Sequence, residues 1–211
     1  MPGEKRYLEI VAHYESCLAR HGDTHLGVDW PNNEDAEKRY KVMLEVIRPG
    51  KNHKLSLLDF GCGASHLYEY ILNRGLQDRF AYSGLDLSPN FVAVSRRKFP
   101  SCHYYELDVL ENNSALPQFD YIVMNGVFTE KRGLAQQEMV EYFQSLVTKV
   151  FTKARTGMAF NVMSKQVDWE RDDLFHLPFD ALAEFLVSRV SRHFVIRHDY
   201  GLYEYTVYVY R

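Results

Sequence analysis

The chain contains 211 residues, of which 46% are hydrophobic and 25% are charged. Such a composition excludes collagen-like, disordered and disulfide-scaffold proteins. The formal net charge of -3 and the lack of a basic stripe argue against a nucleic-acid partner. Three cysteines without C-x-x-C spacing, Cys17, Cys62 and Cys102, favour reduced thiols in the cytoplasm. Apolar runs are too short to span a membrane, so we expect a soluble, cytoplasmic protein.

The first fifty residues contain two predicted amphipathic helices. Apolar side chains recur at helical spacing over residues 7–18 and again over residues 36–47. The segment between them, residues 23–31, shows no such period. We interpret residues 1–50 as a helical lid and residues 51–211 as the main domain.

Strand and helix patterns alternate through the main domain. The expected strands are residues 55–60, 80–87, 103–109, 121–125 and 157–163, and the expected helices are residues 65–75, 89–99, 139–151 and 182–190. Alternation of this kind produces right-handed crossovers and a mostly parallel sheet with helices on both faces. The sequence therefore predicts an α/β, doubly wound fold.

The end of the chain departs from this rhythm. Residues 194–198 and 203–210 are two strand-like runs, joined by a connection too short for a parallel crossover. The last strand is therefore expected to be antiparallel.

A glycine-rich turn follows the first expected strand. Gly61 and Gly63 allow close backbone approach to a ligand, at a position that opens a helix. The dinucleotide fingerprint G-x-G-x-x-G would require glycine at position 66, which is His66. A nicotinamide dehydrogenase is therefore disfavoured.

Acidic residues mark the ends of three successive strands. Asp59 stands at the glycine turn, Asp86 ends the second strand and Asp108 ends the third. Carboxyl ends of parallel strands share one edge of the sheet, where open α/β folds bind ligands. Three carboxylates there are unfavourable beside a pyrophosphate and suit a cationic ligand without phosphate.

This combination resembles the class I S-adenosylmethionine-dependent methyltransferases. The resemblance extends from about Leu57 to the C-terminus and rests on residues 58–63, 84–89, 107–109 and 119–123. It implies a Rossmann-like, seven-stranded, mostly parallel sheet with an antiparallel last strand, here preceded by N-terminal helices. It also implies that S-adenosyl-L-methionine is the cofactor.

The resemblance assigns the cofactor-binding residues one by one. Asp59, Gly61, Cys62 and Gly63 would surround the methionine moiety, Asp86 would bind the ribose, and Leu87 would pack on the adenine. Asp108 and Val109 would contact the adenine, and Asn125 and Gly126 would lie by the sulfonium and the acceptor. Ser65 replaces the third glycine common in this turn, and serine is a good helix cap.

The acceptor is expected beside the loops that follow the fourth and fifth strands and the final hairpin. These loops are residues 125–132, 164–177 and 198–203, and Tyr14 and Trp30 are candidates for closing over the ligands. Candidate catalytic residues are Asn125 and two possible general bases, His176 and His198. Further candidates are Arg132 and Arg171 for a carboxylate clamp, and Tyr200, Tyr203 and Tyr205 for the pocket wall. No metal site is expected, because His21 and His25 lack accompanying ligands.

The leading hypothesis is an enzyme that methylates a small molecule, with an oxygen acceptor as our interpretation. The expected partner is a small-molecule acceptor, and neither a nucleic acid nor a membrane is expected. A homodimer is possible. The first alternative is a non-catalytic, S-adenosylmethionine-binding regulatory subunit. The second is an RNA methyltransferase, although residues 125–128 read Asn-Gly-Val-Phe instead of an Asx-Pro-Pro-aromatic stretch.

Overall fold

The computed structural model describes residues 5–49 and 53–211. The predicted boundary between residues 50 and 51 falls outside these described residues. Before it lie α1 (Leu8–His21), the short 3-10 helix η1 (His25–Val28) and α2 (Asn33–Leu44), so both predicted helices are confirmed. The Asn32 side chain caps α2 by accepting a hydrogen bond from the Asp35 N–H at 2.8 Å.

A mixed sheet forms the centre of the molecule. Its strands are β1 (Leu55–Phe60), β2 (Phe80–Asp86), β3 (His103–Glu106), β4 (Phe119–Phe128), β5 (Ala154–Ser164), β6 (His176–Leu177), β7 (Phe194–Arg197) and β8 (Glu204–Tyr210). Seven of them follow the order β3-β2-β1-β4-β5-β8-β7, and β6 pairs with β5 beside this path. The predicted Rossmann-like, seven-stranded sheet is therefore confirmed, with β6 as an addition.

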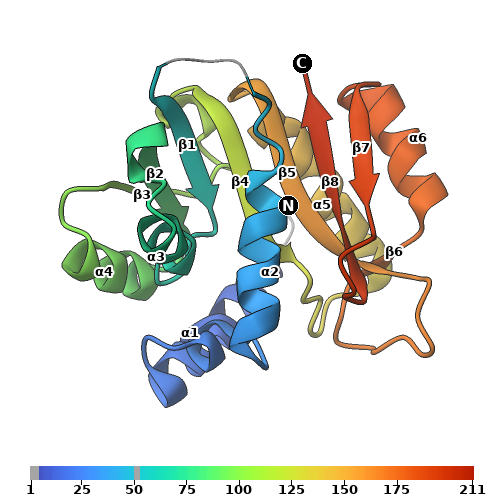
Figure 1. Ribbon diagram of the computed structural model, residues 1–211. Coiled ribbons are helices and arrows are strands. Elements are labelled where there is room, and N and C mark those ends of the chain that lie inside the picture. The colour runs from blue at the N-terminus through green and yellow to red at the C-terminus, as the bar shows by residue number, and fades with distance from the viewer. Residues whose placement is uncertain (1–4, 50–52) are drawn as a thin grey trace.

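The final hairpin is antiparallel, as its short connection predicts. β8 pairs antiparallel with both β5 and β7, whereas β1, β2, β3, β4 and β5 run parallel to one another. In Figure 1 the β8 arrow accordingly points opposite to β1 and β7. The carboxyl ends of the parallel strands consequently meet along one edge of the sheet.

Three strands differ clearly in length from the sequence prediction, and one of them, β5, extends over Ala154–Ser164 instead of residues 157–163. β3 ends at Glu106, because Asp108 accepts a hydrogen bond from the Leu110 N–H at 3.0 Å and the chain turns there. β4 continues to Phe128 through an irregularity between Met124 and Phe128, and Gly126 within it has φ +79°.

Helices cover both faces of the sheet. α2, α3 (His66–Asn73) and α4 (Pro89–Lys98) pack on one face, and α5 (Gln136–Phe151) and α6 (Phe179–Arg189) pack on the other. Successive side chains of β1 point to opposite faces of the sheet, so each face has its own layer of core residues. Leu57 packs on the side of α2, and Leu58 packs on the side of α5. Further 3-10 turns are η2 (Gln77–Arg79) and η3 (Asn113–Ala115).

Helix α1 lies beyond the carboxyl ends of the parallel strands. Figure 1 shows it beneath the sheet, at the end to which the β1 arrow points. α2, by contrast, contributes Ala36, Tyr40 and Met43 to the core against the sheet. Within residues 5–49 and 53–211, no helix combines the length and apolar character needed to cross a membrane.

Candidate active site

The glycine turn after β1 has the backbone geometry that its glycines predict. Gly61 has φ +72° and Gly63 has φ +52°, a region that L side chains rarely adopt. The Gly61 and Cys62 N–H groups both donate to the Leu85 carbonyl, at 2.7 and 3.0 Å. A Cβ at Gly61 would lie 2.7 Å from Val127 Cγ2, so this turn leaves no room for a side chain.

Ser65 does not cap α3, which corrects the sequence expectation. Its backbone is left-handed, with φ +59°, and its side chain makes no capping hydrogen bond. Instead, its buried hydroxyl lies 2.8 Å from the Ser95 hydroxyl and 3.1 Å from that of Tyr104. These buried contacts offset the cost of the left-handed backbone, about 1–2 kcal/mol. Serine therefore replaces the third glycine by bonding into the core.

Asp86 ties the end of β2 to the glycine turn. One carboxylate oxygen accepts a hydrogen bond from the Gly63 N–H at 2.9 Å, and the other accepts from the Ser88 N–H at 2.9 Å. Burial raises the pKa of Asp86 to about 6, although these backbone donors oppose the shift. The carboxylate has about four acceptor positions, so it retains acceptor capacity for a ligand hydroxyl.

Asp59 is the more deeply buried of the two neighbouring acids. It is 3% exposed, and its Oδ2 accepts a hydrogen bond from the Tyr82 hydroxyl at 2.8 Å. Burial raises the pKa of Asp59 to about 7, the Tyr82 hydrogen bond opposes this, and the charge of Asp86 adds to it. A cationic ligand would stabilise the ionised form of both carboxyl groups.

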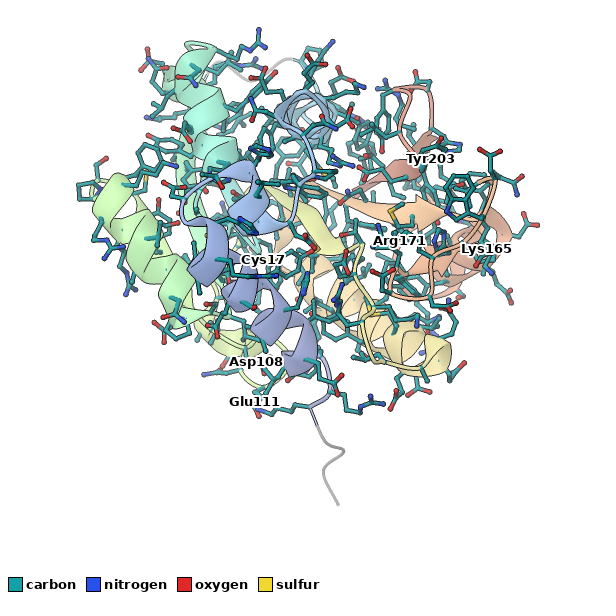
Figure 2. The ribbon with its side chains drawn as sticks, turned by 90° about the horizontal axis from the view of Figure 1, so that it is seen from below. Cys17, Asp108, Glu111, Lys165, Arg171 and Tyr203 are labelled. Carbon is teal, nitrogen blue, oxygen red and sulfur yellow. The ribbon has the colours of Figure 1, made fainter. Side chains whose placement is uncertain are left out.

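Asp108 joins the third strand end to the N-terminal segment. Its Oδ2 accepts a hydrogen bond from the Tyr7 hydroxyl at 2.6 Å, and Lys5 Nζ lies 3.8 Å from the same oxygen. Tyr7 also stacks on Tyr142 of α5, with ring centroids 5.1 Å apart. Seen along the sheet from below, Asp108 and Glu111 lie near α1, which carries Cys17 (Figure 2). Asp108 thus anchors the start of α1 over the sheet edge.

One cavity collects every residue that the sequence assigned to the cofactor. Its wall includes Asp59, Gly61, Cys62, Gly63, Asp86, Leu87, Asp108, Val109, Asn125 and Gly126. Tyr7, Ile10 and Tyr14 of the α1 region also line this cavity. We call this cavity the cofactor pocket. Asn125 Oδ1 is buried on its wall and has no hydrogen-bond partner among the described residues.

A second cavity adjoins the first, and we call it the acceptor pocket. Thr129 and Glu130 follow β4, residues 167–169 follow β5, and Leu202 and Tyr203 belong to the β7–β8 connection. All three loops that the sequence predicted for the acceptor therefore reach this pocket. Tyr14 and Trp30 line both pockets, so the two pockets meet at these side chains, which we call the shared wall.

The two candidate histidines lie in different surroundings. His176 lines the acceptor pocket, but its Nδ1 lies 2.6 Å from the Ser164 carbonyl and its Nε2 accepts from the Arg171 N–H at 3.3 Å. Both ring nitrogens are thus engaged by the backbone. His198 lines neither pocket, and its ring packs against Phe179 with centroids 5.5 Å apart.

Some of the arginine and tyrosine candidates line the acceptor pocket and others do not. Arg171 and Tyr203 line the acceptor pocket, and both are visible on the same side of α1 in Figure 2. Arg132 lines neither pocket and pairs with Glu130 at 3.1 Å. Tyr200 and Tyr205 also lie outside both walls: the Tyr200 hydroxyl lies 2.9 Å from Thr206 Oγ1, and Tyr205 donates to the Leu177 carbonyl at 3.0 Å.

Several pocket residues escaped the sequence analysis. Arg39 and Glu204 form a buried ion pair in the acceptor pocket, with Arg39 Nε 2.9 Å from Glu204 Oε2. Asn161 joins them to the sheet, because it donates to Glu204 Oε1 at 2.9 Å and accepts from the Gly126 N–H at 2.8 Å. Glu130 was missed as well, although its position four residues after Gly126 was a usable signal.

One group of metal-ligating side chains occurs among the described residues. Ligand atoms of His13, Cys17 and Asp29 all lie within 4.8 Å of one another. His13 Nε2 lies 2.7 Å from Asp29 Oδ2, a hydrogen-bond length. Two ligands of one tetrahedral zinc ion would lie about 3.3 Å apart, given bonds of about 2.0–2.1 Å. We therefore interpret this contact as a link between α1 and η1.

Comparisons with known proteins agree with this geometry. The family model described as "Methyltransferase domain" matches residues 58–149. "Putative methyltransferase Rv1506c" of Mycobacterium tuberculosis is 29% identical over 156 residues, which cover 73% of this chain and 92% of that protein.

Solved structures share the fold. The magnesium protoporphyrin IX methyltransferase of Synechocystis PCC 6803, crystallised with bound SAM, is 13% identical, with a TM-score of 0.67 over all of both chains. An S-adenosylmethionine-dependent methyltransferase of Clostridium acetobutylicum is 11% identical, with a TM-score of 0.56 over 98% of this chain and 99% of that one. At these identities the likeness shows the fold.

The sheet order, the glycine turn and the acids at the strand ends define a Rossmann-like enzyme that binds a nucleoside cofactor at its carboxyl edge. Residues 58–149 match the methyltransferase-domain model, and the chain shares its fold with solved enzymes of the class that uses S-adenosylmethionine as cofactor.

The cofactor of this class fits the described pocket. Its sulfonium and amino groups are cationic, and the wall offers the carboxylates of Asp59 and Asp86 and the unpartnered Asn125 Oδ1. Gly63 leaves space at the wall, where a Cβ would come 3.2 Å from Val28 Cγ1. Buried oxygen acceptors with an unused lone pair are the groups that a cation and ribose hydroxyls need.

Proposed function

We propose that this enzyme transfers the methyl group of S-adenosyl-L-methionine to an oxygen atom of a small molecule held in the acceptor pocket. One observation carries the proposal: Tyr14 and Trp30 line both pockets, so the two ligands would meet at these side chains. Bringing two reactants together in one orientation supplies much of the rate of a displacement, up to about 7–11 kcal/mol in model systems.

The cofactor-binding assignments belong to the same proposal. Asp86 binds the ribose hydroxyls with the lone pairs that Gly63 and Ser88 leave unused. Asp59 and Asn125 face the cationic methionine portion, and Asp108 and Val109 contact the adenine. The placement of all these side chains on one cavity wall supports the assignment.

Bound S-adenosylmethionine supplies a methyl carbon activated by positive sulfur: the carbon–sulfur bond breaks as the carbon–oxygen bond forms, and sulfur keeps the electron pair. A hydroxyl acceptor must also lose its proton. We assign the role of the base that removes this proton to Glu130, which is 8% exposed and lines the acceptor pocket. Burial raises the pKa of Glu130, which makes its carboxylate a better proton acceptor, and the hydrogen bond from Arg132 to Oε2 opposes this shift.

His176 and His198 are weaker candidates for this role. Both nitrogens of His176 are engaged by backbone groups, and His198 lies outside both pockets. Asn125 is retained as a residue that orients the cofactor, because its unpartnered oxygen lies on the cofactor-pocket wall.

The proposal is tested with cofactor labelled in the methyl group. Purified protein is incubated with labelled S-adenosylmethionine and a small-molecule metabolite extract, and separately with total RNA. We expect label in a small molecule and none in RNA, and much less label with the Asp86→Asn variant at subsaturating cofactor. Cofactor binding without any labelled product would favour the non-catalytic regulatory subunit. Labelled RNA would favour the RNA methyltransferase.

We also propose a cytoplasmic location. The thiols of Cys17, Cys62 and Cys102 are free, which suits a reducing compartment. The net charge of -3 supports a small-molecule acceptor over a nucleic acid.

A further inference from the structure

Arg39 carries a buried hydrogen-bond donor that nothing in the described chain uses. Its Nε donates to both oxygens of Glu204, at 3.0 and 2.9 Å, and the side chains of Arg39 and Glu204 are 11% and 1% exposed. Arg39 Nη1 is buried and has no partner among the described residues. Arg39 lines the acceptor pocket, so the unused donor belongs to the wall of that site.

An unused buried donor destabilises the folded chain relative to a donor that has a partner. Such a group in a native structure therefore calls for a partner that the chain alone does not supply. The guanidinium is held in place from two sides, because it pairs with Glu204 and stacks 4.2 Å from the centre of the Trp30 ring. A partner oxygen would thus meet a donor of fixed direction.

The charges around Arg39 restrict what that partner is. Glu204 already compensates the guanidinium charge. Asp29, Asp35, Glu130 and Asp168 also line this pocket, so the acids outnumber the cations Arg39 and Arg171 and a second anion beside Arg39 would be repelled. Three of these acids have cationic or histidine partners of their own: His13 for Asp29, Lys38 for Asp35 and Arg132 for Glu130. A cationic ligand would therefore gain little from them.

The rest of the wall favours a flat apolar body. Met163, Leu174 and Leu202 contribute apolar surface, and two aromatic side chains are exposed beside them. Trp169 is 72% exposed and Tyr203 is 64% exposed. Large exposed aromatic groups at the rim of a pocket are typical of ligand-binding surfaces.

We propose that the acceptor pocket binds an uncharged aromatic molecule through a hydroxyl or carbonyl oxygen that accepts a hydrogen bond from Arg39 Nη1. This rests on the proposed function, in which the same pocket holds the methyl acceptor. Arg39 anchors the molecule at this oxygen and fixes the orientation in which it meets the shared wall formed by Tyr14 and Trp30.

Four probes of nearly equal shape test the proposal: benzyl alcohol, toluene, benzoate and benzylamine. The protein is first saturated with S-adenosylhomocysteine. The chain has two tryptophans, Trp30 and Trp169, and both line the acceptor pocket, so their indole N–H signals in NMR spectra report its occupancy. We expect benzyl alcohol to shift both signals and to bind about tenfold more tightly than toluene, the size of a hydrogen bond to a charged donor. Benzoate and benzylamine should bind more weakly than benzyl alcohol.

Variants at Arg39 separate the anchor from the fold. Arg39→Lys retains a cation beside Glu204 but lacks Nη1, and it should reduce the preference for benzyl alcohol over toluene to less than twofold. The double variant Arg39→Gln with Glu204→Gln removes both charges of the ion pair. It replaces Arg39→Lys in this test if that variant does not fold, and the same loss of preference for benzyl alcohol is expected. Arg48→Lys, at an arginine that also stacks on an aromatic ring but lines neither pocket, is the matched control and should leave the preference unchanged.

The outcomes distinguish this inference from the proposed function. An unchanged preference in Arg39→Lys, tighter binding of benzoate or benzylamine, or no binding of any probe would overturn the role of Arg39 while leaving the cofactor site intact. Failure of the wild-type protein to bind S-adenosylhomocysteine in calorimetry would overturn the proposed function itself.

Discussion

Trp30 lies directly against Gly126, so closely that a Cβ at position 126 would come 2.8 Å from Trp30 Cζ2. Gly126 lies within β4 and has φ +79°. Its N–H donates a hydrogen bond to Asn161 Oδ1. The contact thus joins the segment before α2 to the strand end where the two pockets meet. Glycine is required there both for the backbone and for the approach of the indole.

Gly126→Ala should therefore displace Trp30 and disturb the shared wall. We expect at least a tenfold loss of turnover, together with a loss of unfolding free energy of about 1 kcal/mol from the left-handed backbone. Gly75→Ala is the matched control, because Gly75 has φ +66° but no atom within 4 Å of a built Cβ. It should lose similar stability and keep its turnover, and equal losses of turnover in both variants would contradict this role of the Trp30 contact.

Asp86→Asn should weaken cofactor binding at least tenfold. The asparagine side chain keeps one oxygen that can accept a hydrogen bond from the backbone, but an NH2 group replaces the second oxygen. The substitution also removes the negative charge that favours a cationic ligand. Calorimetric titration with S-adenosylmethionine measures the change. Glu106→Gln, at the end of the neighbouring strand but outside the pocket walls, should bind as the wild type does. Wild-type affinity in Asp86→Asn would remove Asp86 from the site.

Burial of Asp59 makes stability depend on pH. Its pKa is raised from 3.8 to about 7 in the folded chain, so between these values the folded state binds more protons than the unfolded state. The free energy of unfolding then falls as pH rises from about 4 to 7. Asp59→Asn removes this contribution and should raise the melting temperature relative to wild type by at least about 2 °C more at pH 8 than at pH 5. A difference that is the same at both pH values would contradict the raised pKa.

Cofactor affinity should also depend on pH. The pKa values of about 7 for Asp59 and about 6 for Asp86 mean that a cation binding below pH 6 must first displace protons. Affinity for S-adenosylmethionine should therefore fall several-fold from pH 8 to pH 5.5. S-adenosylhomocysteine lacks the sulfonium charge and should lose less. The same pH dependence for both compounds would show that the carboxylates do not sense the sulfonium.

Glu130→Gln should reduce turnover of a hydroxyl acceptor by about a hundredfold, the usual range for loss of a general base. Cofactor affinity should stay within twofold, because Glu130 lines only the acceptor pocket. His198→Ala should retain wild-type turnover, since its ring packs against Phe179 away from both pockets. Steady-state kinetics of the two variants decide whether Glu130 or His198 is the base. A large loss of turnover in His198→Ala, with no loss in Glu130→Gln, would assign this role to His198 instead.

The cofactor side of the site could be predicted because its signals are local. Asp59, Gly61 and Gly63 lie within five residues at the end of the first strand, Asp86 ends the second and Asp108 comes shortly after the third, so alternation of elements was enough to bring them to one edge. Parallel strands in sequence order share that edge by necessity.

The acceptor side could be predicted only as a set of loops. Arg39 and Glu204 are 165 positions apart, and no local pattern pairs them. β6 has two residues, too few for a period to be detected. The histidines were chosen by their chemistry alone, and only the packing of Phe179 and the backbone contacts of His176 reveal their surroundings.

Calorimetric titration of the purified chain with S-adenosylhomocysteine and, in parallel, with NADH tests the central claim most directly. The account predicts saturable heat with S-adenosylhomocysteine at one molecule per chain and none with NADH. Saturable binding of NADH, with no heat from S-adenosylhomocysteine, would contradict it.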